Sequence, residues 1–97
     1  MRLVDFTISP LQQKRFMVKF ADPPRVIHFG TKNKNTFIDH MDRRLRHEHF
    51  LRCQYLFQDE ERISDDTLNT AILWGPMPSV EGNLAWFLKR YNINDDR

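Results

Sequence analysis

The sequence predicts an α+β fold, in which a small antiparallel sheet packs with about three helices. Two observations support this prediction. Stretches with a period of two residues are confined to the first 30 residues, and stretches of helical period follow from residue 36 onward. A length of 97 residues, with 40% hydrophobic and 29% charged residues, is typical of one folded domain. We therefore expect residues 1–97 to form a single domain.

Residues 15–30 are predicted to form a β-hairpin. Residues 15–20 alternate between apolar and other side chains, and residues 25–29 resume a strand pattern after a turn that holds two prolines. Since side chains alternate between the faces of a strand, one face of the first strand should be buried. The residues of that face are Phe16, Val18 and Phe20.

The remaining strand residues are assigned by the same alternation. Residues 1–9 alternate weakly and stop at Pro10, which predicts an edge strand. Its inward positions are Val4, Phe6 and Ile8. Phe29 is expected to point inward and His28 outward, because phenylalanine is buried more often than histidine. Gly30 should end the hairpin through a positive φ or a tight turn.

A helical segment is predicted over residues 36–57. Thr36 is a suitable N-cap, and Asp39 stands where a capping box carries an acidic side chain. The spacing of the apolar residues predicts that Met41 and Leu45 face the protein. The opposite stripe is polar and consists of His40, Arg43, Arg44 and His47. After this stripe the apolar phase shifts, so the segment either bends or is buried on more than one side.

Two more helices are predicted in the second half of the chain. A short helix over residues 66–74 is expected to start at Asp65 or Asp66 and to end at a Gly-Pro pair. The terminal helix over residues 79–91 has the clearest helical period in the chain. Its inward positions are Val80, Leu84, Phe87, Leu88 and Tyr91. We expect the polar tail, residues 92–97, to be frayed.

Charge is distributed unevenly along the chain. The first 53 residues hold eleven Lys and Arg against five Asp and Glu, a net charge of +6, whereas residues 54–66 carry a net charge of −4. All four histidines lie in the basic part. Such a basic face either meets a polyanion or is a solvated surface that the acidic segment neutralises.

Several function classes lack their sequence signals. The single Cys53 excludes an internal disulfide and fits a reducing compartment, and Asp5 interrupts any signal peptide, so we expect a protein that is not secreted. The longest apolar run, residues 71–74, is too short for a membrane span. His49 and Cys53 lie on one helical face, but no further ligand has suitable spacing, so neither a metal nor another cofactor is predicted. Because so small a chain leaves little room for a cleft and has no phosphate-binding loop, we expect a non-enzymatic protein, and a nuclease-like activity is the less favoured alternative.

The basic helix is the strongest binding feature in the sequence. Arginine makes bidentate contacts with phosphate, which favours DNA or RNA as the partner. The candidate contact residues are Lys32, Lys34, His40, Arg43, Arg44 and His47. An alternative follows from the twelve aromatic residues, eight of them Phe, because a small core cannot hide them all and exposed rings mark protein interfaces.

Three segments of the chain together form a recognisable pattern: Val26–Lys32, Phe37–Arg44, and Leu73-Trp74 followed by Pro78-Ser79. With the ending Lys89–Tyr91, they resemble, in order and spacing over about residues 15–92, a family of small uncharacterised proteins from large double-stranded DNA viruses. The resemblance implies a viral protein of the virion or the infected host cell, in nucleus or cytoplasm, with no established catalytic residues. A minor capsid or other virion protein, packed against larger viral proteins, is the alternative function.

Five residues of these motifs are expected to serve the fold rather than binding. They are His28, Phe29, Gly30, Leu73 and Trp74. Trp74 is expected to fill the core beneath the last helix, because a large aromatic side chain contributes much buried area.

Overall fold

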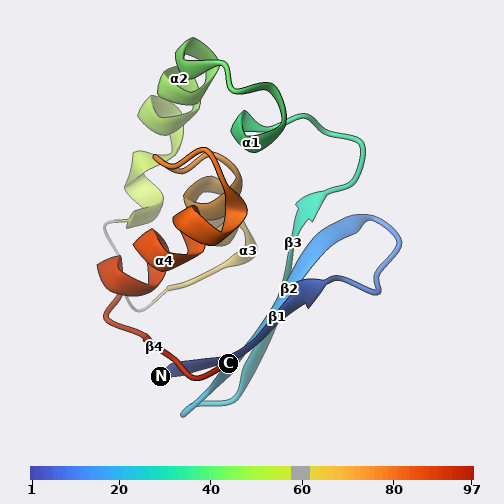
Figure 1. Cartoon of the computed structure of the whole chain (residues 1–97), viewed down its shortest axis with the longest axis vertical. Coiled ribbons are helices and arrows are strands. Elements are labelled where there is room, and N and C mark those ends of the chain that lie inside the picture. Colours follow the sequence, from blue (N-terminus) through green and yellow to red (C-terminus); the bar gives the residue numbers. More distant parts are fainter. Residues whose placement is uncertain (58–61) are drawn as a thin grey trace.

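The computed structural model describes residues 1–57 and 62–97, and it has a four-stranded sheet with helices packed on one face (Figure 1). The strands are β1 (Arg2–Ile8), β2 (Lys14–Ala21), β3 (Arg25–Thr31) and β4 (Asn94–Asp95), in the order β3-β2-β1-β4. The helical elements are α1 (Phe37–His40), α2 (Arg43–Cys53), the 3₁₀ turn η1 (Gln54–Phe57), α3 (Asp65–Leu68), the π-helical turn η2 (Asn69–Leu73) and α4 (Val80–Arg90). The α+β prediction is confirmed.

The predicted hairpin is formed by β2 and β3. The strands pair antiparallel, with Phe16 opposite Phe29 and Val18 opposite Ile27. Val18 and Phe29 are fully buried, and Phe16 packs half-buried against the ring of Phe6 in β1 at 5.4 Å between centroids. The predicted buried face is therefore correct, and Phe20, only 3% exposed, completes it.

A bulge in β1 changes which of its residues face the core. The register shifts between Leu3 and Asp5, so that Leu3 pairs with Phe20. Leu3 is fully buried, whereas Val4 occupies the bulge and is only half-buried. The inward assignment was wrong for Val4 and for Ile8, which ends the strand 75% exposed. One extra residue in a strand reverses the alternation on either side of it.

The C-terminal segment is ordered, contrary to the expectation of a frayed tail. After α4 the chain reverses at Asn92 (φ 54°), and the amide of Ile93 donates to the carbonyl of Leu88 at 2.8 Å. Ile93 is buried, and β4 then pairs in parallel with the start of β1. Thus β1 lies inside the sheet and is not the edge strand that its sequence predicted.

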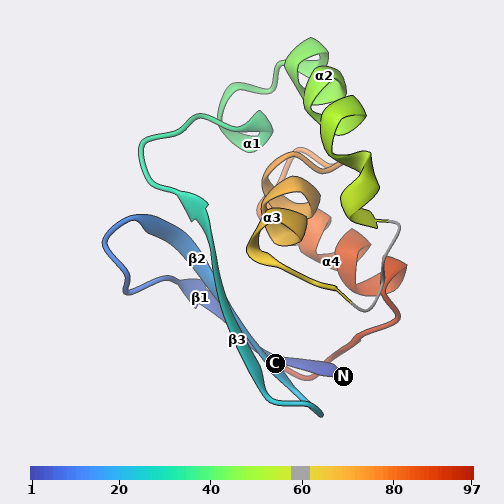
Figure 2. The ribbon, with the colours of Figure 1, turned by 180° about the vertical axis from the view of Figure 1, so that it is seen from behind.

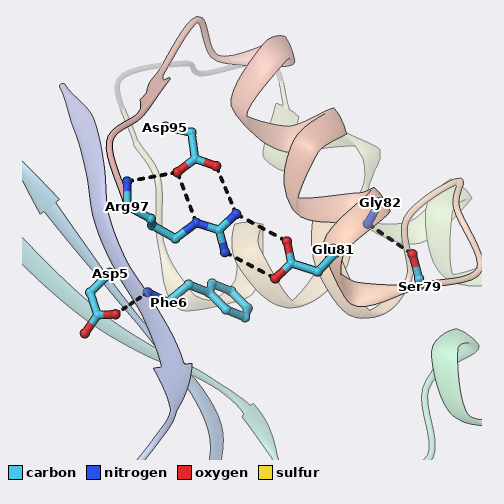
Figure 3. A network of polar contacts seen from close by, with 7 residues as sticks. All are labelled: Asp5, Phe6, Ser79, Glu81, Gly82, Asp95 and Arg97. Atoms are coloured by element: carbon cyan, nitrogen blue, oxygen red, sulfur yellow. Dashed lines mark hydrogen bonds and ion pairs between the residues drawn. The ribbon is translucent and has the colours of Figure 1, made fainter.

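A network of polar contacts fastens this segment to α4 (Figure 3). The Arg97 guanidinium bonds Asp95 at 2.9 and 3.0 Å and spans both carboxylate oxygens of Glu81 at 3.2 Å. Glu81 lies in the first turn of α4, where the helix dipole favours an acidic side chain. The same view includes the N-cap of α4, in which Ser79 accepts from the amide of Gly82 at 3.0 Å.

The predicted helix over residues 36–57 is interrupted. Its capping box at Thr36 and Asp39 is present, but α1 ends after one turn, where Met41 adopts a left-handed conformation (φ 57°). A second cap, Asp42, then starts α2 by accepting from the amides of Arg44 and Leu45. The new start changes the direction of the helix. As a result Met41 and Leu45, predicted to face inward, are 44% and 43% exposed.

The last two predicted helices are present, with one change of cap. The short helix begins at Ser64, whose hydroxyl accepts from the amide of Thr67, and not at Asp65 or Asp66. Its inward residues Ala71 and Ile72 are fully buried. In α4 the predicted face is buried at Leu84, Phe87 and Leu88, while Val80 and Tyr91 are partly buried.

Asn83 of α4 organises the loop between η2 and α4. It is fully buried and donates to the carbonyls of Ile72 and Met77, both at 2.9 Å, while its Oδ1 accepts from the amide of Met77 at 2.7 Å. Gly75 is closed in by this arrangement. A Cβ atom there would lie 2.1 Å from the carbonyl oxygen of Ala71 and 2.5 Å from Oδ1 of Asn83.

Candidate nucleic-acid interface

Helix α2 lies at one end of the molecule, beside α1 and away from the turn between β2 and β3 (Figures 1 and 2). None of its residues is buried, and its apolar side chains are exposed, with Leu45 at 43%, Phe50 at 42% and Leu51 at 54%. A helix of a small domain ordinarily buries an apolar stripe. Therefore other contacts must hold α2 in place.

Two polar side chains make these contacts. The Arg46 guanidinium lies over the ring of Phe37 at 5.0 Å from the centroid and donates to the carbonyl of Pro76 at 3.1 Å. The His49 ring stacks parallel on Trp74 at 4.3 Å, with Nε2 3.2 Å from the hydroxyl of Thr70. Burial, and then the charge of Arg52, lower the pKa of His49. Our sequence reasoning missed both as docking residues, because charged and imidazole side chains in a basic helix indicate a solvated face.

Trp74 lies at the margin of the core rather than beneath the last helix. His49 covers one of its faces, and the ring of His40 approaches at 5.4 Å in an edge-to-face arrangement. The expectation that Trp74 fills the core under the terminal helix was wrong. The π-helical turn before it ends at Leu73 and directs the following side chain toward α2.

The predicted polar stripe is only partly realised. Arg43, Arg44 and His47 are exposed on α2, and Arg44 forms an ion pair with Glu48 at 3.5 Å. His40 belongs to α1 and turns inward, where its Nδ1 accepts from the amide of Asp42 at 2.9 Å and its Nε2 is buried without a hydrogen-bond partner among the described residues. The prediction of an exposed His40 was wrong because the break at Met41 separates it from α2.

Lys32 and Lys34 are both exposed in the loop between β3 and α1. Lys34 borders a hollow of about 300 Å³ between this loop and α3. The hollow is also lined by Lys14, Asp65 and Asp66, and Lys14 pairs with Asp65 at 3.6 Å. Because acids and bases share this hollow, its net attraction for an anion is weak.

The motif residues meet in space and support the fold. Gly30 has a positive φ of 77°, and a Cβ atom there would lie 2.9 Å from Cδ1 of Leu73, which is fully buried. Two motifs far apart in the sequence are thus in contact. His28 lies half-buried on the other face of the sheet from Phe29, with Nδ1 2.8 Å from the hydroxyl of Ser9.

An ion pair fixes the position of α1 against β2. Arg15 binds both carboxylate oxygens of Asp39, at 2.8 and 3.2 Å, and the same carboxylate accepts from the amide of Thr36 at 2.8 Å. The hydrogen bonds from Arg15 above all lower the pKa of Asp39 to about 2. The pair therefore holds the first turn of α1 against β2.

We expect Asp39→Asn to lower stability in a pH-dependent way. A carboxyl group whose pKa is depressed on folding stabilises the native state above its unfolded pKa, and this contribution is lost as the pH falls toward 2. Because the pair is partly exposed, the loss at pH 7 should be about 1 kcal/mol. Urea unfolding between pH 7 and pH 2.5 measures it. Asp66→Asn is the control, and a difference from wild type that stays constant down to pH 2.5 would contradict the assignment.

An apolar groove of about 250 Å³ runs beside α2. Four aromatic residues line it: Phe50, Phe57, Trp74 and Trp86. Phe57 links two of the others, because its ring is parallel to that of Phe50 at 6.4 Å and perpendicular to that of Trp86 at 5.8 Å. Arg46 and His47 also line the groove, and none of its lining residues within 1–57 and 62–97 is acidic. In the sequence, the only signal for this groove is that Arg46 and Phe50 are one helical turn apart, which places them on the same face of α2.

Cys53 is a free, half-buried thiol. Within residues 1–57 and 62–97, no group of three or more His, Cys, Asp or Glu is placed to hold a metal ion. In the same residues, no helix has the length and apolar character to cross a membrane. The acidic residues 59–61, which contribute to the negative segment of the sequence, lie outside the described residues.

Residues 4–53 match a family described as "Family of unknown function (DUF5754)". The chain belongs to this family. The matched segment is just over half of the chain and runs from β1 to the last residue of α2, so it includes the hairpin, the loop with Lys32 and Lys34, and the basic helix. No curated protein and no solved structure matches the chain.

Proposed function

We propose that this DUF5754 member is a small non-enzymatic module that binds nucleic acid through the exposed cations of α2, with Lys32 and Lys34 of the preceding loop adding long-range attraction. The proposal includes the setting implied by the sequence motifs, a protein of a large DNA virus that acts in the virion or the infected cell.

The observation that carries the proposal is the unbalanced charge of α2. Its eleven residues hold four arginines and one acid, Glu48. Elsewhere the described arginines are often neutralised by acids, as Arg15 is by Asp39 and Arg97 by Glu81 and Asp95. In contrast, Arg43 and Arg52 form no ion pair within residues 1–57 and 62–97. Cations that the fold leaves unpaired create the positive surface to which phosphates bind.

The position of Arg43 and Arg44 supports a role in binding. Both lie in the first turn of α2, which contains no acidic residue. The helix dipole is positive at this end and disfavours cations there. The dipole therefore gives no reason for arginines at this end, and they add to the positive potential that a phosphate would meet.

A second candidate is the packing of α2 against another protein, such as a larger virion protein. The observation that favours it is the exposure of Leu45, Leu51 and Tyr55, the last at 62%, on and after α2. Exposed apolar side chains grouped on one element mark protein interfaces. We prefer nucleic acid because the four arginines dominate the same helix.

The test of the proposal is binding to a DNA duplex and to a single strand as a function of salt. We expect Arg43→Ala combined with Arg44→Ala to weaken binding about equally across sequences. The slope of log K against log salt should fall by roughly 1 to 2 units, since each lost phosphate contact removes about 0.7 to 0.9. The melting temperature should hardly change, because exposed arginines contribute little to stability.

The matched control is Lys19→Ala combined with Arg25→Ala, which removes two exposed cations from the sheet, away from α2. It removes the same charge and should leave most of the salt slope intact. If the wild type binds neither form of DNA at low salt, the nucleic-acid proposal is wrong and the protein-packing candidate replaces it. If the arginine variant instead melts many degrees lower, the two arginines are structural.

A further inference from the structure

The groove beside α2 exposes aromatic rings that the core does not need. Phe50 is 42% exposed, and Trp86 is half-buried although the next residue of α4, Phe87, is fully buried. One face of Trp74 is already taken by His49. The open ring surface of the groove is therefore contributed mainly by Phe50 and Trp86, with Phe57 packed between them.

The polar groups of the groove favour an anionic ligand. Within the described residues, Arg46 makes one hydrogen bond, to the carbonyl of Pro76, and a guanidinium has five N–H groups. His47 makes no hydrogen bond within the same residues. Since the lining includes these two side chains, and no acid among the residues that the structure describes, the groove suits a ligand with both an aromatic ring and a negative charge. An apolar peptide would gain nothing from the cations.

We propose that this groove accommodates an unpaired base of a single-stranded nucleic acid, stacked on Phe50 and Trp86, with an adjoining phosphate near Arg46 and His47. The inference rests on the proposed function and names its preferred ligand. A groove of about 250 Å³ has room for a base and not for a duplex. A base inside a duplex is paired and stacked, so it reaches such a site only by being extruded. The protein therefore prefers single strands.

The two tryptophans of the chain provide a direct reporter, since both line the groove. Titration with an oligothymidylate of about 15 nucleotides should quench their fluorescence, because a stacked base contacts the rings. The single strand should bind about 10-fold more tightly than a hairpin duplex of equal phosphate number. Inorganic polyphosphate should bind without quenching.

Phe50→Ala should weaken binding of the single strand about 5-fold or more and leave duplex binding unchanged. Tyr55→Ala is the matched control, because Tyr55 is also an exposed aromatic residue but does not line the groove. Both variants change exposed side chains, and circular dichroism verifies that they fold.

The outcomes separate this inference from the proposed function. Equal binding of both nucleic acids without quenching, or no effect of Phe50→Ala, overturns the base site and leaves the role of α2 standing. Quenching by polyphosphate alone also overturns it, because the groove would then be an anion site. Loss of all binding at low salt overturns both.

Discussion

Asn83→Ala is expected to destabilise the protein by about 3 kcal/mol, because it leaves the buried carbonyl of Ile72 and two part-buried backbone groups of Met77 without partners. The carbonyl of Ile72 and the amide and carbonyl of Met77 all bond to the Asn83 side chain, which is fully buried. Each buried group left unpaired costs about 1 kcal/mol or more. For a domain of this size the melting temperature should fall by roughly 12 °C or more.

Lys89→Ala, an exposed change in the same helix, is the control and should alter the melting temperature little. Gly75→Ala should be destabilising by a second route, since its Cβ would collide with the carbonyl oxygen of Ala71. An Asn83→Ala variant that melts within a few degrees of wild type would show that water or a rearranged loop satisfies these groups.

Ending the chain at Asn92 is expected to cost about 3 to 4 kcal/mol. The deletion removes Ile93, whose burial is worth about 2 kcal/mol, and β4, whose backbone pairs with the start of β1. It also removes the amide of Asp96, which donates to the carbonyl of Leu3 at 2.8 Å, and the contacts of Arg97. Calorimetric melting measures the loss.

Single substitutions divide this effect among its sources. Ile93→Ala should account for most of it, at about 2 kcal/mol, whereas Arg97→Ala should cost less than about 1 kcal/mol because its ion pairs are at the surface. Asn94→Ser, which retains the backbone of β4, is the control. A truncated chain with unchanged melting would mean that the segment does not stabilise the domain in solution.

Local patterns predicted the elements whose partners are close in sequence. The alternation in residues 15–20 identified the face with Val18, and the helical period of residues 79–91 identified the face with Leu84 and Phe87. The first residue of that predicted segment, Ser79, is the N-cap of the helix. In these segments the hydrophobic period and the geometry of the element agree, so the pattern determines which side is buried.

The candidate site was predictable in its charge but not in its shape. The exposure of Arg43, Arg44 and His47 follows from their sequence, since charged and polar side chains at this helical spacing favour a solvated face. The helix break did not follow, because Met41 has no sequence preference for the left-handed conformation that it adopts. That break turned His40 toward Trp74 and brought Arg46 and Phe50 to the groove.

By itself, the sequence determined the strand faces of the hairpin, the terminal helix and the excess of positive charge in the first half of the chain. Only the tertiary structure decided the bulge at Val4, the docking of α2 through Arg46 and His49, and the pairing of β4 with β1. The physical reason is the range of the interactions. The hydrophobic period of a segment indicates which face of that helix or strand is buried. In contrast, the pairing of β4 with β1 joins residues about 90 positions apart. Ile93 stands alone as an apolar residue in the tail, so it forms no hydrophobic period that could predict its burial. Such long-range contacts form only because the rest of the fold brings the two segments together.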